Sequence, residues 1–139
     1  MSDVLEDSRL VESDDAASAA ERLEREGDLP SARALYATAS ARTAAVALEV
    51  TGLPRTRSIL AVSAVCLAAR AGRYDRAVDL AERFLAEPGA LSRDGVAELH
   101  ELLANYRMTL QRGRTAAAPP ASRIRRTRPL GRPRARSAS

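Results

Sequence analysis

Four short breaks that contain glycine or proline divide this chain of 139 residues into stretches long enough for helices. The breaks lie at 27–30, 51–54, 71–73 and 88–89. Alanine, the best helix former, occurs 29 times, whereas only four residues are aromatic, too few for a β-sandwich or barrel. We therefore predict an all-α protein with helices at roughly 14–26, 30–50, 57–71, 74–87 and 92–110.

Charge separates the chain into a helical domain and a tail. Its 22 basic residues are all arginine, and with 18 acidic residues the formal net charge is +4. Residues 1–110 carry a net charge of −5, whereas 111–139 carry +9 and no acidic residue. Prolines in 111–139 remove backbone donors, and like charges repel, which disfavours packing. We predict a flexible acidic N-terminus at 1–12, a helical domain at 13–110 and a disordered basic tail at 111–139.

Two of the expected helices have distinct apolar patterns. The run Ile59–Ala69 leaves almost no polar face, so we expect its helix to be buried on nearly all sides, in the middle of a stack. The last helix is amphipathic, with apolar residues at helical spacing on one face. We expect it to close the core. Its apolar face is also a candidate surface for a partner or a second copy of the chain, formed by Leu99, Leu103, Tyr106 and Leu110.

The turns at Gly27 and Gly72 begin a repeated pattern of residues. The first copy is Gly27, Leu29, Ala32, Tyr36 and Ala39, and the second is Gly72, Tyr74, Ala77, Ala81 and Phe84. The order of glycine, a large residue at +2 and alanine at +5 resembles the turn and second helix of a tetratricopeptide repeat (TPR). In such a hairpin glycine permits a sharp turn, the +2 side chain plugs the end, and the +5 alanine lets two helices approach closely.

The TPR resemblance covers about residues 13–90 and implies a short α-solenoid of about two hairpins, followed by a C-terminal capping helix. The sequence departs from the family pattern in three ways. Its two glycines lie 45 residues apart rather than about 34, the second copy exchanges its small and aromatic residues, and tryptophan is absent. A longer second helix or an inserted loop would explain the spacing. The segment 54–63 also resembles segments of bacterial TPR-like proteins.

The resemblance implies a concave face that binds a peptide or a partner protein. On the first helices of the two hairpins the sequence offers acidic residues at one end and apolar residues at the other: Asp14, Ala17, Glu21, Glu24, Ile59, Val62 and Cys66. It offers no cationic clamp for a carboxylate, and such a groove suits a basic or hydrophobic helix. We predict a non-enzymatic adaptor that binds another protein or peptide and could form homodimers.

No pattern of catalytic or metal-ligating residues is recognisable in the sequence. His100 and Cys66 are the only histidine and cysteine, and Cys66 lies in the helix that we expect to be buried, where a thiol behaves as a small apolar group. The glycines form neither a phosphate-binding loop nor a nucleophile elbow. We therefore expect no enzyme, no metal and no cofactor.

Arg55, Thr56 and Arg57 precede the apolar helix and form a candidate anion site. Free N–H groups, a hydroxyl and two guanidinium groups could together hold a phosphate or a carboxylate. The alternative is that Thr56 or Ser58 caps the helix while the arginines pair with acids such as Glu49.

The basic tail suggests a second function class. The segment Arg128-Pro129-Leu130-Gly131-Arg132-Pro133-Arg134 resembles an AT-hook, with Leu130 in place of the first core arginine. Candidate nucleic-acid contacts are Arg125, Arg126, Arg128, Arg132, Arg134 and Arg136. The alternative function is thus a protein that binds DNA or RNA weakly through this tail. A competing explanation is that a high-GC genome writes such a tail where nothing constrains it.

Location can also be predicted from composition. The longest apolar run is about half of the roughly 20 residues that a bilayer requires, so we expect no membrane span. The first residues are acidic and show no signal peptide, and a single cysteine fits a reducing compartment. We predict a cytoplasmic protein.

Overall fold

The computed structural model describes residues 7–117, and within this range it contains helices and no strand. The helices are α1 (Ser8–Arg25), α2 (Leu29–Glu49), α3 (Pro54–Arg70), α4 (Tyr74–Leu85), a short 3₁₀ turn η1 (Pro88–Ala90) and α5 (Arg93–Ala117). The predicted all-α class is confirmed. None of these helices is both long enough and apolar enough to cross a bilayer.

The chain divides into two compact units, residues 1–107 and 108–139. The first unit holds α1 to α4 and most of α5. Of the second unit the structure describes the last turns of α5, to Ala117. The six tail arginines named above as nucleic-acid contacts lie outside the described residues.

Two helix ends differ from those predicted. Helix α1 begins at Ser8, inside the segment expected to be flexible, because the Asp7 carboxylate accepts a hydrogen bond from Arg9 N at 2.8 Å and caps the first turn. Helix α5 continues beyond the predicted end at 110 to Ala117. The residues 111–117 contain no proline, and alanine, arginine and glutamine are good helix formers.

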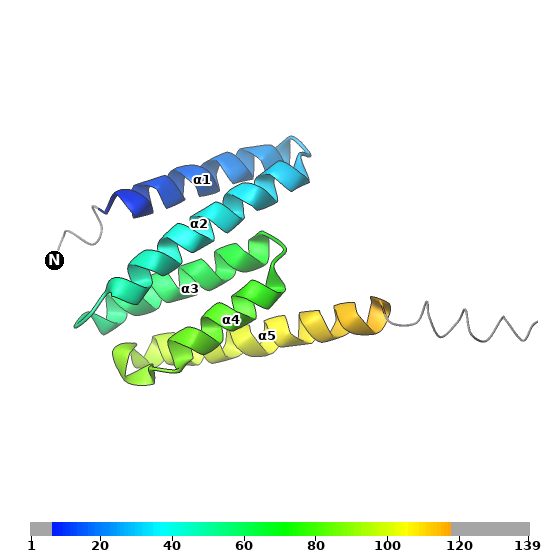
Figure 1. The fold of residues 1–139 in the computed structure, drawn as a ribbon. Coiled ribbons are helices and arrows are strands. Elements are labelled where there is room, and N and C mark those ends of the chain that lie inside the picture. The colour runs from blue at the N-terminus through cyan, green and yellow to red at the C-terminus, as the bar shows by residue number, and fades with distance from the viewer. Residues whose placement is uncertain (1–6, 118–139) are drawn as a thin grey trace, which may run out of the picture. The chain divides into compact units, whose positions relative to one another are not determined.

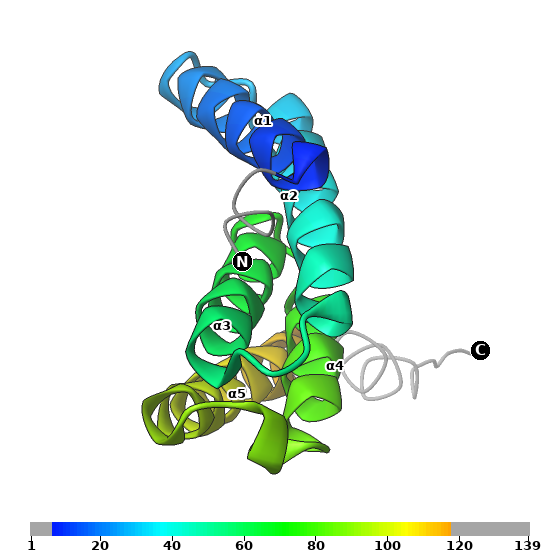
Figure 2. The ribbon, with the colours of Figure 1, turned by 90° about the vertical axis from the view of Figure 1, so that its left-hand side faces the viewer.

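The helices of the first unit stack in chain order. Helix α1 packs on α2, α2 on α3, and α3 on α4, with each neighbour running back along the one before (Figure 1). The first part of α5 lies on the same side as α3, whereas α2 and α4 form the other side (Figure 2). This arrangement leaves one face of α3 next to the start of α5.

The two glycine turns have the same backbone geometry. Gly27 and Gly72 adopt left-handed φ values of 88° and 77°. In each turn the glycine N–H bonds to a carbonyl three residues back, and the next N–H bonds to one five residues back, at 2.9–3.0 Å. Both helices therefore end in a Schellman motif, which glycine favours because it has no Cβ.

The repeated alanines lie where two helices meet, since Ala32 and Ala77 are completely buried. The larger repeat positions Tyr36 and Phe84 are buried as well. Leu29, however, is 46% exposed and does not plug its hairpin, whereas Tyr74 packs against Tyr106 with ring centroids 5.6 Å apart. Helix α2 has 21 residues and α4 has 12, so a longer second helix accounts for most of the wide glycine spacing.

The core consists of two clusters, and alanine dominates the smaller one. The larger cluster contains residues of α2, α3, α4 and α5 and includes Leu60, Val65, Leu80 and Phe84. The smaller joins α1 and α2 around Tyr36, with Ala20, Ala32 and Ala71. Buried hydroxyls tie neighbouring helices together: the Ser13 hydroxyl donates to Ala39 O at 3.0 Å, and the Ser40 hydroxyl donates to Ala64 O at 2.7 Å.

The prediction that the third helix is buried on nearly all sides was wrong. Ile59 is 64% exposed, Ser63 is exposed, and Val62 and Cys66 are half-buried. Helix α5 covers only part of α3, because it meets α3 through Ser58 and Gly95 and then packs its apolar residues into the core. An apolar row on α3 therefore remains open to solvent.

Candidate functional site

The three residues of the candidate anion site occupy very different environments. Arg57 is 5% exposed, and its Nη1 donates to the last carbonyls of α2: 2.8 Å to Ala47 O, and 3.3 Å to both Leu48 O and Val50 O. Its guanidinium carbon lies 5.6 Å from the centroid of the Phe84 ring. Arg57 thus caps the carboxyl end of a neighbouring helix from the side, and its donors face the protein rather than a ligand.

Arg55 and Thr56 lie at the surface of the same turn. Arg55 is exposed, and Thr56 is half-buried. Neither Thr56 nor Ser58 caps α3, because its N-cap residue is Leu53 and no side chain bonds to its first turn. Glu49, the acid expected to pair with these arginines, instead accepts two hydrogen bonds from Arg9 at 2.8 Å. Among the three, Arg55 is the one placed to meet a partner.

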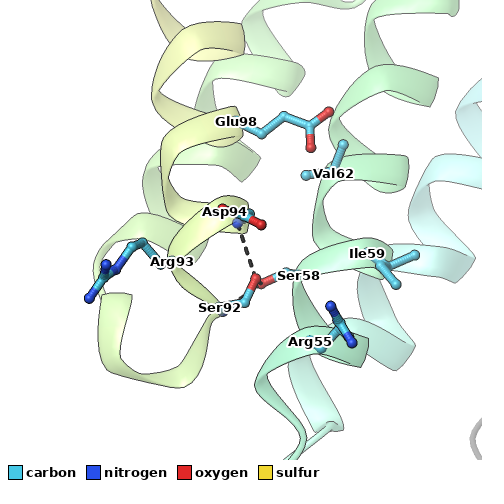
Figure 3. A pocket seen from close by; sticks show the side chains of 9 residues that line it. Arg55, Ser58, Ile59, Val62, Ser92, Arg93, Asp94 and Glu98 are labelled. Atoms are coloured by element: carbon cyan, nitrogen blue, oxygen red, sulfur yellow. Dashed lines mark hydrogen bonds between the residues drawn. The ribbon is translucent and has the colours of Figure 1, made fainter.

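An open pocket of about 390 Å³ lies between the first turns of α3 and α5 (Figure 3). Ser58, Ser92 and Gly95 line it where the two helices meet. Ser58 Oγ accepts the backbone N–H of Ser92 at 2.8 Å, and Ser92 Oγ accepts the N–H of Gly95 at 3.1 Å, which caps α5. These bonds hold the two helix starts side by side and set the width of the pocket.

The pocket has one apolar side and one charged side. Ile59 and Val62 line it from α3, and Asp94 and Glu98 line it from α5. Glu98 points across the pocket toward Val62, whereas Arg93 points away from it (Figure 3). Arg55 lies at the end where α3 begins. The lining therefore offers hydrocarbon surface opposite two carboxylates, together with two arginines: Arg55 at the end of the pocket, and Arg93, whose side chain is directed outward (Figure 3).

Cys66 follows Val62 by one turn along the open face of α3. Burial raises the pKa of the Cys66 thiol, so the thiol is protonated at neutral pH. Its hydrogen-bond partner is the Tyr106 hydroxyl, at 4.0 Å, rather than His100, which is exposed. Burial also raises the pKa of Tyr106 to about 12. The geometry does not form a cysteine–histidine nucleophile pair.

Two acids of the predicted groove, Glu21 and Glu24, share one cation within the protein, whereas Asp14 is exposed. Arg70 lies 3.1 Å from Glu24 and 3.6 Å from Glu21, and its guanidinium carbon stacks 4.4 Å from the Tyr36 ring centroid. The Tyr36 hydroxyl also donates to Glu24 at 2.7 Å. These residues hold α1, α2 and α3 together. Within residues 7–117 no group of three potential metal ligands comes together.

The predicted partner surface on the last helix is mostly inside the protein. Leu99 is completely buried and Leu103 is 6% exposed, both within the large core cluster. Tyr106 is half-buried against that cluster, and Leu110 belongs to the second unit. Leu99 and Leu103 close the core, as predicted for the last helix. These two side chains therefore offer no free surface to a partner.

Sequence reasoning missed the residues that form the pocket from the α5 side. Ser92 at the start of a helical stretch is a recognisable N-cap signal, but it does not reveal that Gly95 lies against α3. Comparison with family models, curated proteins and solved structures finds nothing that matches this chain. The function therefore has to be argued from the pocket itself.

Proposed function

We propose that the chain is a non-enzymatic protein–protein interaction module, and that its docking surface is the pocket between α3 and α5. The observation that carries this proposal is the exposure of Ile59. At 64% it is the most exposed of the large apolar side chains described, and it lies in a concave site rather than alone on a flat surface. Burying a fully exposed isoleucine is worth about 1.5–3 kcal/mol. Because Ile59 is 64% exposed, more than half of this is available to a partner.

The proposed architecture is a short TPR-like α-solenoid. Its support is the pair of Schellman turns at Gly27 and Gly72, each followed by a buried alanine at the fifth position. In such a stack the first helices of successive hairpins share a face, and α3 and α5 share the one that bears the pocket. A cytoplasmic location remains part of the proposal, on the strength of the single free cysteine.

A photo-crosslinking residue at position 59 tests the docking surface. The matched control position is 41, where Ala41 is exposed on α2, away from the pocket. We expect a partner crosslinked from position 59 and not from 41. The purified partner should then bind Ile59→Asp at least tenfold more weakly than the unchanged chain. Val11→Asp, at another exposed apolar residue (52%), should bind as the unchanged chain does.

Two results would refute the proposal. Equal weakening by Ile59→Asp and Val11→Asp would show that charge, not the pocket, matters. Salt-sensitive binding of duplex DNA by the full chain, lost on truncation after Ala117 while no partner crosslinks at position 59, would favour the alternative function through the arginine-rich tail.

A further inference from the structure

We propose that the pocket between α3 and α5 binds an arginine side chain that a partner presents beside an aliphatic residue. This inference rests on the proposed function and names the partner chemistry that the pocket selects. In the bound state the arginine stem lies along Ile59 and Val62, and its guanidinium group pairs with Glu98 and Asp94.

The two sides of the pocket match the two parts of an arginine side chain. The apolar side, Ile59 and Val62, is hydrocarbon that is open to solvent on a helix otherwise rich in alanine. Arginine buries its methylene stem along such surfaces while its charged end remains polar. An aliphatic neighbour in the partner would cover the remaining exposed surface of Ile59.

The two carboxylates of the pocket form no ion pair in the described part of the protein. Three other surface acids are paired, Glu82 with Arg107, Glu12 with Arg42 and Asp75 with Arg73, whereas Asp14, Asp79 and Glu101 form no ion pair within residues 7–117. Asp94 and Glu98 form no ion pair or side-chain hydrogen bond among residues 7–117. Their charges are therefore free to pair with a partner.

The spacing of the carboxylates favours arginine. Asp94 and Glu98 are four residues apart on α5, so they lie on one face of the helix, about 6 Å apart at their Cβ atoms. A guanidinium group carries five N–H donors in a planar fork and can serve two carboxylates, whereas an ammonium group is a single point charge.

Arg55 gives the site a direction. It lines the end of the pocket where α3 begins, whereas Glu98 lies one turn farther along α5 than Asp94. A bound guanidinium is repelled from Arg55 and attracted to Glu98. The apolar residue of the partner therefore lies toward Ile59, and its arginine lies toward Glu98.

A phage-displayed library of random 12-residue peptides, selected on the full chain, tests this inference. We expect the enriched peptides to pair arginine with leucine, isoleucine or valine. A resynthesised peptide with citrulline in place of that arginine, which is isosteric but neutral, should bind at least tenfold more weakly. Glu98→Gln should weaken binding of the arginine peptide by a similar factor and remove the difference between the two peptides.

Glu101→Gln is the matched control, because it makes the same charge change on α5 at an exposed residue that does not line the pocket. It should bind both peptides as the unchanged chain does. Peptides that require Ile59 but tolerate citrulline would overturn this inference and leave the proposed function standing. Peptides unaffected by Ile59→Asp would overturn both. A dimer of the full chain that Ile59→Asp abolishes would assign the pocket to a second copy and also overturn the inference.

Discussion

Gly95 on α5 lies directly against the side chain of Ser58 on α3, so that a Cβ at position 95 would overlap the Oγ and Cβ of Ser58. The same Ser58 hydroxyl accepts the N–H of Ser92, which caps α5. One close approach therefore fixes where α5 starts, how near it lies to α3, and how wide the pocket between them is.

Gly95→Ala should destabilise the protein, although alanine is the better helix former. The new methyl group has no room beside Ser58, and overpacking of this kind costs about 1–3 kcal/mol. Urea denaturation followed by circular dichroism measures the change. Gly113→Ala is the matched control, because nothing lies within 4 Å of a Cβ there, and it should leave stability unchanged or raise it by about 0.5–1 kcal/mol.

A second substitution, at Ser58, tests why Gly95→Ala should lower stability. Combining Gly95→Ala with Ser58→Gly removes the overlapping side chain, so the cost of the added methyl group should be smaller in the Ser58→Gly background. If Gly95→Ala costs the same in both backgrounds, the contact with Ser58 is not its cause.

Arg57→Met should be strongly destabilising, whereas Arg55→Met should not. Methionine retains the apolar volume but removes the donor shared by Ala47 O, Leu48 O and Val50 O and the ion pair with Glu87, which together cost about 2–4 kcal/mol. Arg55 is exposed, and its replacement should change the free energy of unfolding by less than about 0.5 kcal/mol. Thermal and urea denaturation of the two variants measure the difference. Equal effects would contradict the capping role of Arg57.

Acid should weaken the attachment of the start of α1. Hydrogen bonds from Arg9 hold the pKa values of Asp7 and Glu49 below their usual range. Because these pKa values are lower in the folded protein, their contribution to stability is present above about pH 4, the usual pKa of such groups, and is lost as the pH falls further. Arg9→Met should therefore lower the urea midpoint at pH 7, and its effect should shrink as the pH falls below about 4 through the lowered pKa values of the two acids.

Arg76→Met serves as the control for this pH dependence, because Arg76 is exposed on α4 and forms none of the ion pairs found among residues 7–117. Its effect on the urea midpoint should be small and nearly independent of pH. If Arg9→Met behaves in the same way, the contacts of Arg9 with Asp7 and with Glu49 at the end of α2 do not contribute to the attachment of α1.

The sequence allowed the helices to be placed because glycine, proline and alanine act locally. Gly27 and Gly72 end helices through their own backbone, and no knowledge of the rest of the protein is needed to see this. The pocket could not be predicted in that way. The apolar run from Ile59 looks the same whether α5 covers it or only touches one edge, and that depends on where Gly95 meets Ser58.

The burial of Arg57 could not be predicted from the sequence either. An arginine next to a helix start normally indicates a solvated residue or an anion site, and neighbouring Arg55 does lie at the surface. Arg57 is buried because α2 ends beside it and presents carbonyl oxygens that accept from its guanidinium group. That juxtaposition follows from the length of α2 and its packing against α3, which no local pattern encodes.

The remaining prediction concerns the reactivity of Cys66, which lies one turn from Val62 on the open face of α3. Burial raises the pKa of this thiol, so iodoacetamide should alkylate it at pH 7 at least tenfold more slowly than in the urea-unfolded chain. The hydrogen bond from Tyr106 opposes burial and lowers the pKa, so Tyr106→Phe should slow alkylation further. Mass spectrometry of the modified chain measures these rates. His100→Ala should leave the rate unchanged, because His100 is not the partner of the thiol. A slower rate in that variant would reveal a cysteine–histidine pair and contradict the proposed non-enzymatic function.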